Sequence, residues 1–259
     1  MCALTLALVL RTPLARRIVS APRPDRWNAL ATPQVGGIGI FAGLAFGTLA
    51  AVRLGILQMP LRPIAGDFRQ VLGILVACGL LFVAGLLDDA TYLPPLGKLA
   101  AQFGAAAIAI WAGTGTTLVH NHWLCIAIAV LWLVGITNVF NLLDLRPGRS
   151  IKALVLLGAA LTAASGQVRT MWSLGLFAGP ALIAGAYDLR ERAMLGDTGA
   201  NLLGALGGLW LVMTLSGTGQ AVALGVLAAI TVYGEVRSIS AFVERTPGLR
   251  YLDSLGRPS

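Results

Sequence analysis

The chain has 259 residues, of which 57% are apolar and only 12% are charged, and its mean hydropathy is +0.81. A soluble domain needs more polar residues to cover its surface, so this composition excludes an ordinary soluble protein and predicts an integral membrane protein. The net charge of +8 comes from residues that flank apolar segments and form no separate basic module, which argues against binding to nucleic acid.

Apolar segments separated by polar residues predict an all-α, polytopic protein with about nine transmembrane helices in a single transmembrane domain, residues 1–259. A lipid-crossing helix needs about 20 residues, with roughly 17 as the lower limit. The first and last segments are shorter than this, so each is either tilted, half-buried or extended into flanking polar residues. The predicted segments are 1–10, 36–51, 71–87, 99–119, 123–140, 151–165, 172–187, 200–215 and 221–233.

Basic residues are divided unequally between the two sets of alternate loops. One set carries fifteen of the 19 Lys and Arg residues, and the other carries only Arg53, Arg62, Arg69 and Arg169. Because cytoplasmic loops are enriched in Lys and Arg, this predicts an external N-terminus, a cytoplasmic C-terminus and a cytoplasmic basic tail at 236–259.

Acidic residues do not follow the positive-inside rule, yet ten of the eleven fall on the basic side, with Asp67 the exception. Asp88 and Asp89 end an inward-running helix, where the helix dipole disfavours a carboxylate. We therefore expect a compensating cation, either Lys98 at the start of the next helix or a bound divalent ion. A solvated aspartate pair without a partner is the alternative.

The end of the fifth segment carries polar residues at a spacing of three, Asn138, Asn141 and Asp144. This spacing places the side chains along one slowly drifting helix face, where they can converge on a ligand. Hydrogen bonds between helices, or a cap at the end of the helix, would explain the same residues. The run LRPGRSIK that follows adds basic side chains near a helix N-terminus, where they are well placed to bind phosphate; they are Arg146, Arg149 and Lys152.

The run MLGDTGAN at 194–201 precedes the eighth segment. Asp197 or Thr198 is a candidate N-cap of that helix. A cap needs only one such residue, however, and glycines on both sides allow a ligand to approach the backbone and leave the carboxylate free to bind a metal ion.

Four motifs together resemble one family. GGIGI (36–40), LLDDATYLPPLGKLAAQ (86–102), NVFNLLD (138–144) and MLGDTGANLLG (194–204) follow in this order, each at the basic end of a segment. They are similar to the polyprenyl-phosphate N-acetylhexosamine-1-phosphate transferases of glycosyltransferase family 4. That family includes the phospho-MurNAc-pentapeptide translocase and the enzymes that start O-antigen and teichoic-acid synthesis. The resemblance extends approximately from residue 33 to residue 204.

The resemblance implies a phosphoglycosyl transferase of cell-envelope glycan synthesis at the cytoplasmic face of the cell membrane. The reaction would transfer a sugar 1-phosphate from a UDP-sugar to a polyprenyl phosphate, release UMP, and use Mg²⁺, with Mn²⁺ as the alternative. Its expected partners are therefore the lipid phosphate, the nucleotide sugar and the membrane. Whether the chain is a monomer or a homodimer is left open.

The family pattern gives these residues roles. Asp88 and Asp89 match the paired aspartates near the lipid phosphate, and Lys98 matches the lysine near the phosphates. The expected catalytic residues are Asp88, Asp89, Lys98 and Asp144; the expected metal ligands are Asp197 and Asp88; the expected substrate-binding residues are Asn138, Asn141, Arg146, Arg149, Lys152 and Thr198.

The chain departs from the family pattern in three places. Residues 145–148 read LRPG where the family has Gly-x-Asp/Asn-Gly, so that one carboxylate is replaced and two arginines, Arg146 and Arg149, lie in or beside the loop. The family's histidine-rich loop is absent, since the only histidines, His120 and His122, lie in an outer loop. These two could bind a metal, but residues near the headgroups explain them as well. The family's last span is also missing, which indicates a short, divergent branch.

Two alternative functions follow from these departures. The first is a noncatalytic membrane protein that uses the same scaffold to bind or move a lipid phosphate. The altered loop favours it, whereas four retained aspartates favour a metal-dependent enzyme. The second is a secondary transporter, which predicts ionisable residues near the bilayer midplane, and the sequence has essentially none there.

Overall fold

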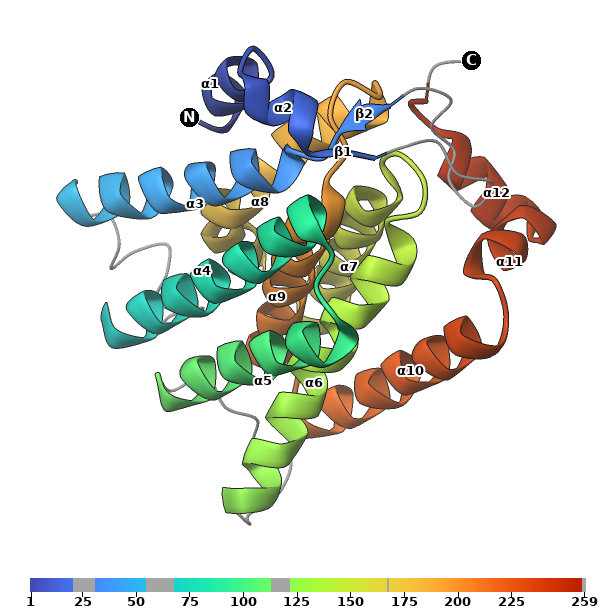
Figure 1. The fold of residues 1–259 in the computed structure, drawn as a ribbon. Coiled ribbons are helices and arrows are strands. Elements are labelled where there is room, and N and C mark those ends of the chain that lie inside the picture. The colour runs from blue at the N-terminus through green and yellow to red at the C-terminus, as the bar shows by residue number, and fades with distance from the viewer. Residues whose placement is uncertain (21–30, 55–67, 113–121, 167, 258–259) are drawn as a thin grey trace.

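The computed structural model describes residues 1–20, 31–54, 68–112, 122–166 and 168–257, and these fold into helices apart from one pair of two-residue strands (Figure 1). The strands pair antiparallel, with Val19 opposite Pro33. The elements are α1 (Cys2–Val9), α2 (Pro13–Arg17), β1 (Val19–Ser20), β2 (Thr32–Pro33), α3 (Gly36–Arg53), α4 (Phe68–Thr91), α5 (Pro95–Trp111), α6 (His122–Leu143), α7 (Arg149–Ser165), α8 (Val168–Leu189), α9 (Gly196–Thr214), α10 (Gly217–Val236), α11 (Ile239–Arg245) and α12 (Pro247–Ser254).

The all-α prediction is confirmed for the described residues. Each predicted segment has a helix, although positions 1, 10, 112 and 215 lie just outside the helix ends and positions 113–119 lie outside the described part. In that part of the chain, two helices are long and apolar enough to cross a membrane, at 69–91 and 217–234. The last predicted segment is thus extended at both ends, because α10 has 20 residues. The nine-span topology and the external N-terminus stay predictions.

Helix α1 is too short to cross a bilayer alone. Its eight residues span about 12 Å at about 1.5 Å per residue, whereas the hydrocarbon core is about 30 Å thick. It packs instead beside α3 and α8, where Leu6 is fully buried against Gly39 and the Sγ of Cys2 donates to the carbonyl of Pro180 at 3.3 Å. The short first segment was expected to be tilted, half-buried or extended, and the structure agrees with a helix that is partly buried against its neighbours.

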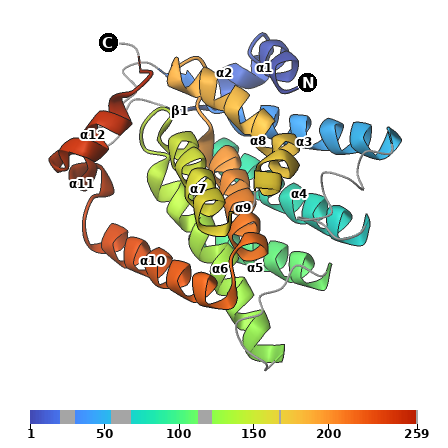
Figure 2. The ribbon, with the colours of Figure 1, turned by 180° about the vertical axis from the view of Figure 1, so that it is seen from behind.

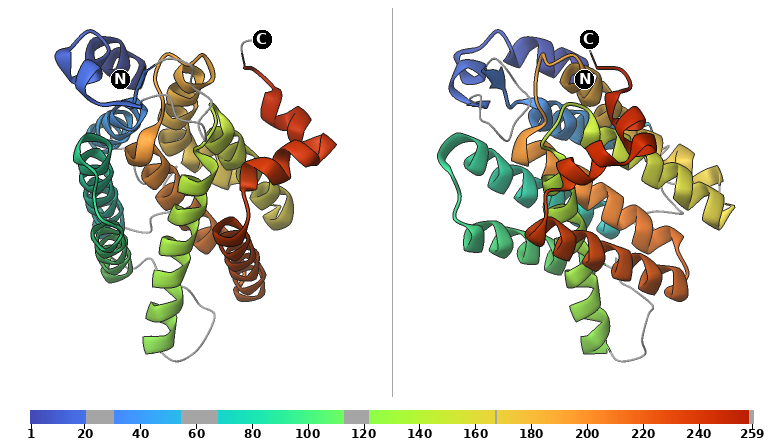
Figure 3. Two further views of the ribbon diagram at one scale, coloured as in Figure 1. Left: turned by 45° about the vertical axis from the view of Figure 1, so that its right-hand side comes forward. Right: turned by 90° about the vertical axis from the view of Figure 1, so that its right-hand side faces the viewer.

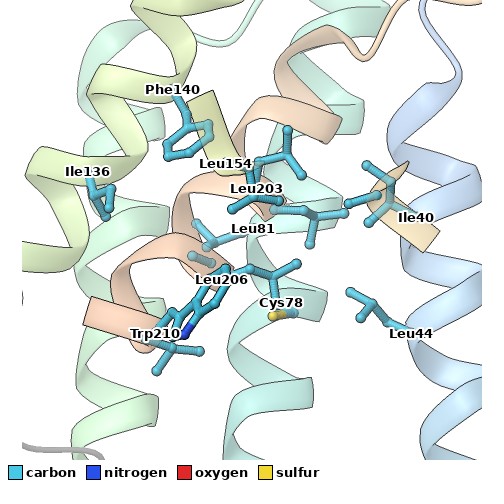
Figure 4. Close-up of a cluster of buried hydrophobic side chains, with 14 of the residues drawn as sticks. Ile40, Leu44, Cys78, Leu81, Ile136, Phe140, Leu154, Leu203, Leu206 and Trp210 are labelled. Carbon is cyan, nitrogen blue, oxygen red and sulfur yellow. The ribbon is translucent and has the colours of Figure 1, made fainter. Parts of the chain in front are cut away.

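Helix α9 lies at the centre of the bundle and contacts α3, α4, α6 and α7 (Figures 1 and 2). Its sequence is apolar on nearly every side, as a helix surrounded by other helices requires. Leu203, Leu206 and Trp210 of α9 are buried against α4, α6 and α7, and Figure 4 shows this cluster with Leu81 and Phe140. The central position of α9 means that its first turn is surrounded by the ends of several other helices.

Small residues allow α9 to approach α6 closely. A Cβ added to Gly204 would lie 2.5 Å from the Cα of Thr137, which is closer than real Cβ contacts. In a membrane, packing of this kind is a main source of attraction between helices, because lipid tails are as apolar as the side chains. The glycine therefore sets the distance between the two helices that carry the polar motifs.

Helices α11 and α12 follow α10 and fold back towards the start of α7 (Figures 1 and 3). Each of their preceding residues has extended backbone, and the hydroxyl of Ser238 caps α11 by accepting from the amide of Ala241. The basic tail predicted at 236–259 is therefore folded over most of its length. The side of the membrane on which it lies stays a prediction.

Replacing Gly204 by alanine tests the close contact of α9 with α6. We expect a lower midpoint of thermal unfolding in detergent, because overpacking costs about 1–3 kcal/mol when backbone must move. The control is Gly225→Ala on α10, where an added Cβ meets nothing within 4 Å. It should leave the midpoint unchanged or raise it slightly, since alanine favours helix. Equal destabilisation by both variants would contradict the close contact.

Candidate functional site

The segment that enters α3 lies against the segment that enters α9. The amide of Gly36 donates to the carbonyl of Met194 at 2.9 Å, and the amide of Gly37 donates to the carbonyl of Leu195 at 3.2 Å. A Cβ on Gly37 would lie 2.5 Å from the backbone nitrogen of Gly199. The double glycine therefore has a steric reason, which is to let α3 begin in contact with the first turn of α9.

Asp89, at the end of α4, caps the N-terminus of α9. Its Oδ1 accepts from the amide of Asp197 at 2.9 Å, and its Oδ2 accepts from the amide and the hydroxyl of Thr198 at 3.0 and 2.6 Å. Gly196 has φ +67, and a Cβ there would lie 2.6 Å from the same carboxylate. The N-cap position is Leu195, without a side-chain cap, so neither Asp197 nor Thr198 is the N-cap: both lie inside the helix.

Lys98 lies between Asp88 and Asp197. Its Nζ forms an ion pair with the Oδ2 of Asp88 and donates to the Oδ2 of Asp197 at 2.9 Å. The side chain of Asp88 is 6% exposed, whereas those of Lys98 and Asp197 are 35% and 31% exposed, so the cluster is open on one side. Of the two cations expected to compensate Asp88, the lysine is in place.

The turn between α4 and α5 directs Lys98 back towards α4. The Oδ1 of Asp88 accepts from the amide of Leu93 at 2.7 Å, which fixes the chain directly after α4. Pro94 is the N-cap of α5 and Pro95 its first residue, where the fixed φ of proline favours the start of a helix. Asp88 thus shapes the turn with one oxygen and binds Lys98 with the other.

Asn141 connects α6 with α9. Its Nδ2 donates to the Oδ1 of Asn201 at 3.0 Å, which is the interhelical hydrogen bond that the sequence left as an alternative. Its Oδ1 is buried and accepts no hydrogen bond from the described residues. Asn138 lies one turn earlier on α6 and is partly buried. The Oδ1 of Asn141 is therefore a buried acceptor that no donor among the described residues satisfies, and Asn141 lies next to the first turns of α9.

Asp144 lies directly after α6 and interacts with two groups that the sequence did not single out. Ser150 donates its hydroxyl to the Oδ1 of Asp144 at 3.1 Å. Burial, together with the neighbouring carboxylate of Asp188, raises the pKa of Asp144 above its ordinary value. Asp188 is 2% exposed, and its Oδ2 accepts from the amide of Gly148 at 2.6 Å. The only signal for Asp188 in the sequence was its place among the acids of the basic side.

The three basic residues predicted to bind substrate contact the C-terminal helices. Arg146 pairs with Glu244 of α11, and Arg149 donates from Nε and Nη2 to both oxygens of Asp253 of α12, at 2.9 and 3.0 Å. The Nζ of Lys152 donates to the backbone carbonyl of Asp253 at 2.5 Å. Neither acid was singled out from the sequence. The substrate role of the three basic residues stays a prediction.

The donor set fits a magnesium ion of the ordinary kind. Among the described residues, no three acidic, histidine or cysteine side chains are grouped closely enough to hold a metal by themselves. Mg²⁺, however, is commonly bound through one or two carboxylates, with waters and substrate phosphates completing its shell. Asp88 and Asp197, which both meet Lys98, can supply that number of carboxylates. His120 is outside the described residues, and so is the side chain of His122, so the structure does not address the alternative outer metal site.

An apolar groove in two parts lies beside Leu143, the residue before Asp144. Its larger part, about 680 Å³, lies between α6, α7, α9 and α10, and includes Phe140, Leu157 and Leu211. A second part of about 490 Å³ continues towards α11 and α12 and shares Leu143 with the first. Because Leu143 immediately precedes Asp144, the groove connects an apolar, helix-lined space with the polar end of the bundle.

Comparison with known proteins gives one family and two relatives. Residues 71–216 match the family described as Glycosyl transferase family 4. Over 220 residues the chain is 28% identical to a protein of Bacillus subtilis (strain 168) named probable undecaprenyl-phosphate N-acetylglucosaminyl 1-phosphate transferase, covering 77% of this chain. Over 211 residues it is 27% identical to a protein of Mycolicibacterium smegmatis named decaprenyl-phosphate N-acetylglucosaminephosphotransferase, covering 73% of this chain. The matches span only 58% and 51% of those two proteins.

Replacing Asp89 tests the cap on α9. Asp89→Ala should lower the midpoint of thermal unfolding in detergent, because a donor left unsatisfied in a buried site costs about 1–3 kcal/mol. Asp89→Asn should lose less, since its amide oxygen can still accept from the backbone of Asp197 or Thr198. An alanine variant as stable as the unmodified protein would contradict the cap.

Proposed function

Because the chain belongs to glycosyl transferase family 4, we propose that it transfers a sugar 1-phosphate from a UDP-sugar to a polyprenyl phosphate at the cytoplasmic face of the cell membrane. In the net reaction, an oxygen of the lipid phosphate becomes bonded to the phosphorus that carries the sugar. The bond from that phosphorus to UMP breaks, and UMP leaves. The names of both relatives agree with the lipid acceptor, and the UDP donor is part of the proposal.

The observation that carries the proposal is the cluster of Lys98 with Asp88 and Asp197. A lysine ammonium has three donors, and here two of them serve the carboxylates. The third is available to a phosphate oxygen on the open side of the cluster. A cation held between two acids, and still partly exposed, is suited to a substrate that brings further negative charge.

The metal-binding role goes to Asp197 and Asp88. Bound Mg²⁺ would neutralise phosphate charge and hold the two phosphates in line for displacement. Lys98 would orient the phosphate from the other side. Asp89 would keep the first turn of α9 in place, since its carboxylate is already bound to the backbone of that turn.

The lipid acceptor would use the apolar groove between α7 and α10. Its walls suit an isoprenoid chain, and Leu143, at the junction of its two parts, would bring the phosphate head to the level of Asp144. The basic ends of the helices would face the cytoplasm, as the positive-inside rule predicts, so that the soluble nucleotide sugar enters from that side. We propose this orientation together with the reaction.

A noncatalytic protein that binds or moves a lipid phosphate is the second candidate. It is favoured by one observation, the engagement of Arg146, Arg149 and Lys152 by α11 and α12. Those cations were expected to bind the phosphate of a substrate, and in this structure they bind protein carboxylates and a carbonyl. The following assay separates the two candidates.

Purified protein with MgCl₂, polyprenyl phosphate and a panel of UDP-sugars should release UMP and form a lipid-linked sugar phosphate. Omission of the lipid phosphate or addition of EDTA should stop UMP release. Binding of polyprenyl phosphate without turnover of any donor in a broad panel would instead support the noncatalytic protein.

Asp197→Asn should reduce metal-dependent turnover by at least about a hundredfold, the size of loss seen when one electrostatic contact to a transition state is removed. The fold should persist, because the amide still accepts from Lys98. The Mg²⁺ concentration for half-maximal activity would show whether the variant binds the metal more weakly than the unmodified protein. Full activity at the same Mg²⁺ concentration would contradict the metal role.

A further inference from the structure

Residues 147–150, shortly after Asp144 in the chain, are each held by a different group. The carbonyl of Pro147 accepts from the Nε of Arg257 at 3.0 Å, and the amide of Gly148 donates to Asp188 at 2.6 Å. The two positions that follow are Arg149, bound to Asp253, and Ser150, whose hydroxyl donates to Asp144. The segment is thus fixed from inside the bundle by Asp188 and from outside by α12.

The outer attachment is a buried, two-point ion pair. Arg149 is 5% exposed and Asp253 is 7% exposed, and the guanidinium meets both carboxylate oxygens. The Nη1 of Arg149 donates in addition to the hydroxyl of Ser240, at 2.8 Å, and Arg257 donates to the Oδ1 of Asp253, also at 2.8 Å. Although burial opposes the charged form, the two arginines lower the pKa of Asp253, so the carboxylate is charged at neutral pH.

Arg149 needs this partner because of its position. It is the first residue of α7, where the helix dipole disfavours a cation. A buried charge without a partner is strongly destabilising, so loss of the carboxylate would force the arginine, and the start of α7 with it, to move. Ser150 is the next residue, and its hydrogen bond to Asp144 would move with the same turn.

The altered loop and the C-terminal helices also match in charge. Residues 145–148 read LRPG, and Arg146 and Arg149 are the two arginines in and beside this loop. Each of them meets an acid from the C-terminal helices, Glu244 on α11 or Asp253 on α12. Contacts with acids of the same chain therefore account for the presence of the two arginines in and beside this loop.

We propose that Asp253 is a positioning residue for Asp144: through Arg149 it fixes residues 147–150, and through Ser150 this segment fixes the Asp144 carboxylate in the site. The effect on turnover rests on the proposed transferase function, whereas the effect on the segment itself does not. Asp253 touches no reacting atom; it acts through Arg149 and also holds Arg257, which donates to the carbonyl of Pro147.

The test compares Asp253→Asn with Arg245→Gln in the full chain. Both remove one charge from the C-terminal helices, but Arg245 is exposed. In Asp253→Asn we expect faster amide hydrogen exchange at 148–152 and a kcat lower by at least about tenfold, since a shift of about 1 Å in a reacting group costs on the order of a hundredfold. The KM for polyprenyl phosphate should change less than kcat. Arg245→Gln should match the unmodified protein in all three measurements.

Arg149→Lys provides a second test of the same link. It keeps the positive charge but loses the two-point contact, so it should reproduce the exchange and kcat changes of Asp253→Asn. Asp253→Glu should restore part of the lost kcat, because the carboxylate is kept.

The outcomes separate the two proposals. Unchanged exchange at 148–152 in Asp253→Asn would overturn the positioning role, whatever the activity. Faster exchange with unchanged kcat in an active protein would also overturn it, because the segment would then not control Asp144. An unmodified protein inactive with every donor would refute the proposed function, while the exchange measurements would still decide whether α12 fixes the segment.

Discussion

The capped N-terminus of α9 is the constraint on which the site depends. The first amides of any helix have no partner within the helix, and at the centre of a bundle with little access to water they must find one in another segment. Asp89 supplies it from α4, and this requires close approach. A Cβ on Gly85 would lie 2.5 Å from the Cα of Thr198, and a Cβ on Gly196 would meet Asp89 itself. Because Asp88 is the neighbour of Asp89, the same contact also places Asp88 opposite Asp197.

Charged residues form two separate groups around this end of the bundle. The inner group holds Asp88, Asp89, Asp144, Asp188 and Asp197, with Lys98 as the cation that meets two of them. The outer group holds Arg146, in the loop before α7, and Arg149, the first residue of α7. These two meet Glu244 and Asp253. The inner group is rich in carboxylates and the outer group pairs its charges internally. A further cation would therefore be stabilised in the inner group, and the outer group has a structural role in this conformation.

The sequence was sufficient for features that depend on local pattern. Hydropathy located the helices, and the position of acids at one set of helix ends placed Asp88, Lys98 and Asp197 at one face, where they do meet. It was insufficient where the outcome depends on which groups touch. Asp89 caps a helix 108 residues away from it, and Asp253 binds an arginine 104 residues away. Contacts of this kind leave no periodic signal in the sequence. Asp188 and Asp253 were therefore not singled out, and Asp197 or Thr198 was considered as the N-cap of α9 in place of Asp89. The partial burial of α1 likewise depends on a surface formed by α3 and α8.

The arrangement has a consequence for how two phosphates could be brought together. Lipid phosphate and nucleotide diphosphate both carry negative charge, and they repel each other unless cations lie between or beside them. In this structure the cations after Asp144 bind protein groups, so the opposing charge has to come from the α9 end of the site. There Lys98 has one donor to spare, which is too little for both substrates. We therefore propose, as part of the transferase function, that a divalent ion supplies the remaining positive charge.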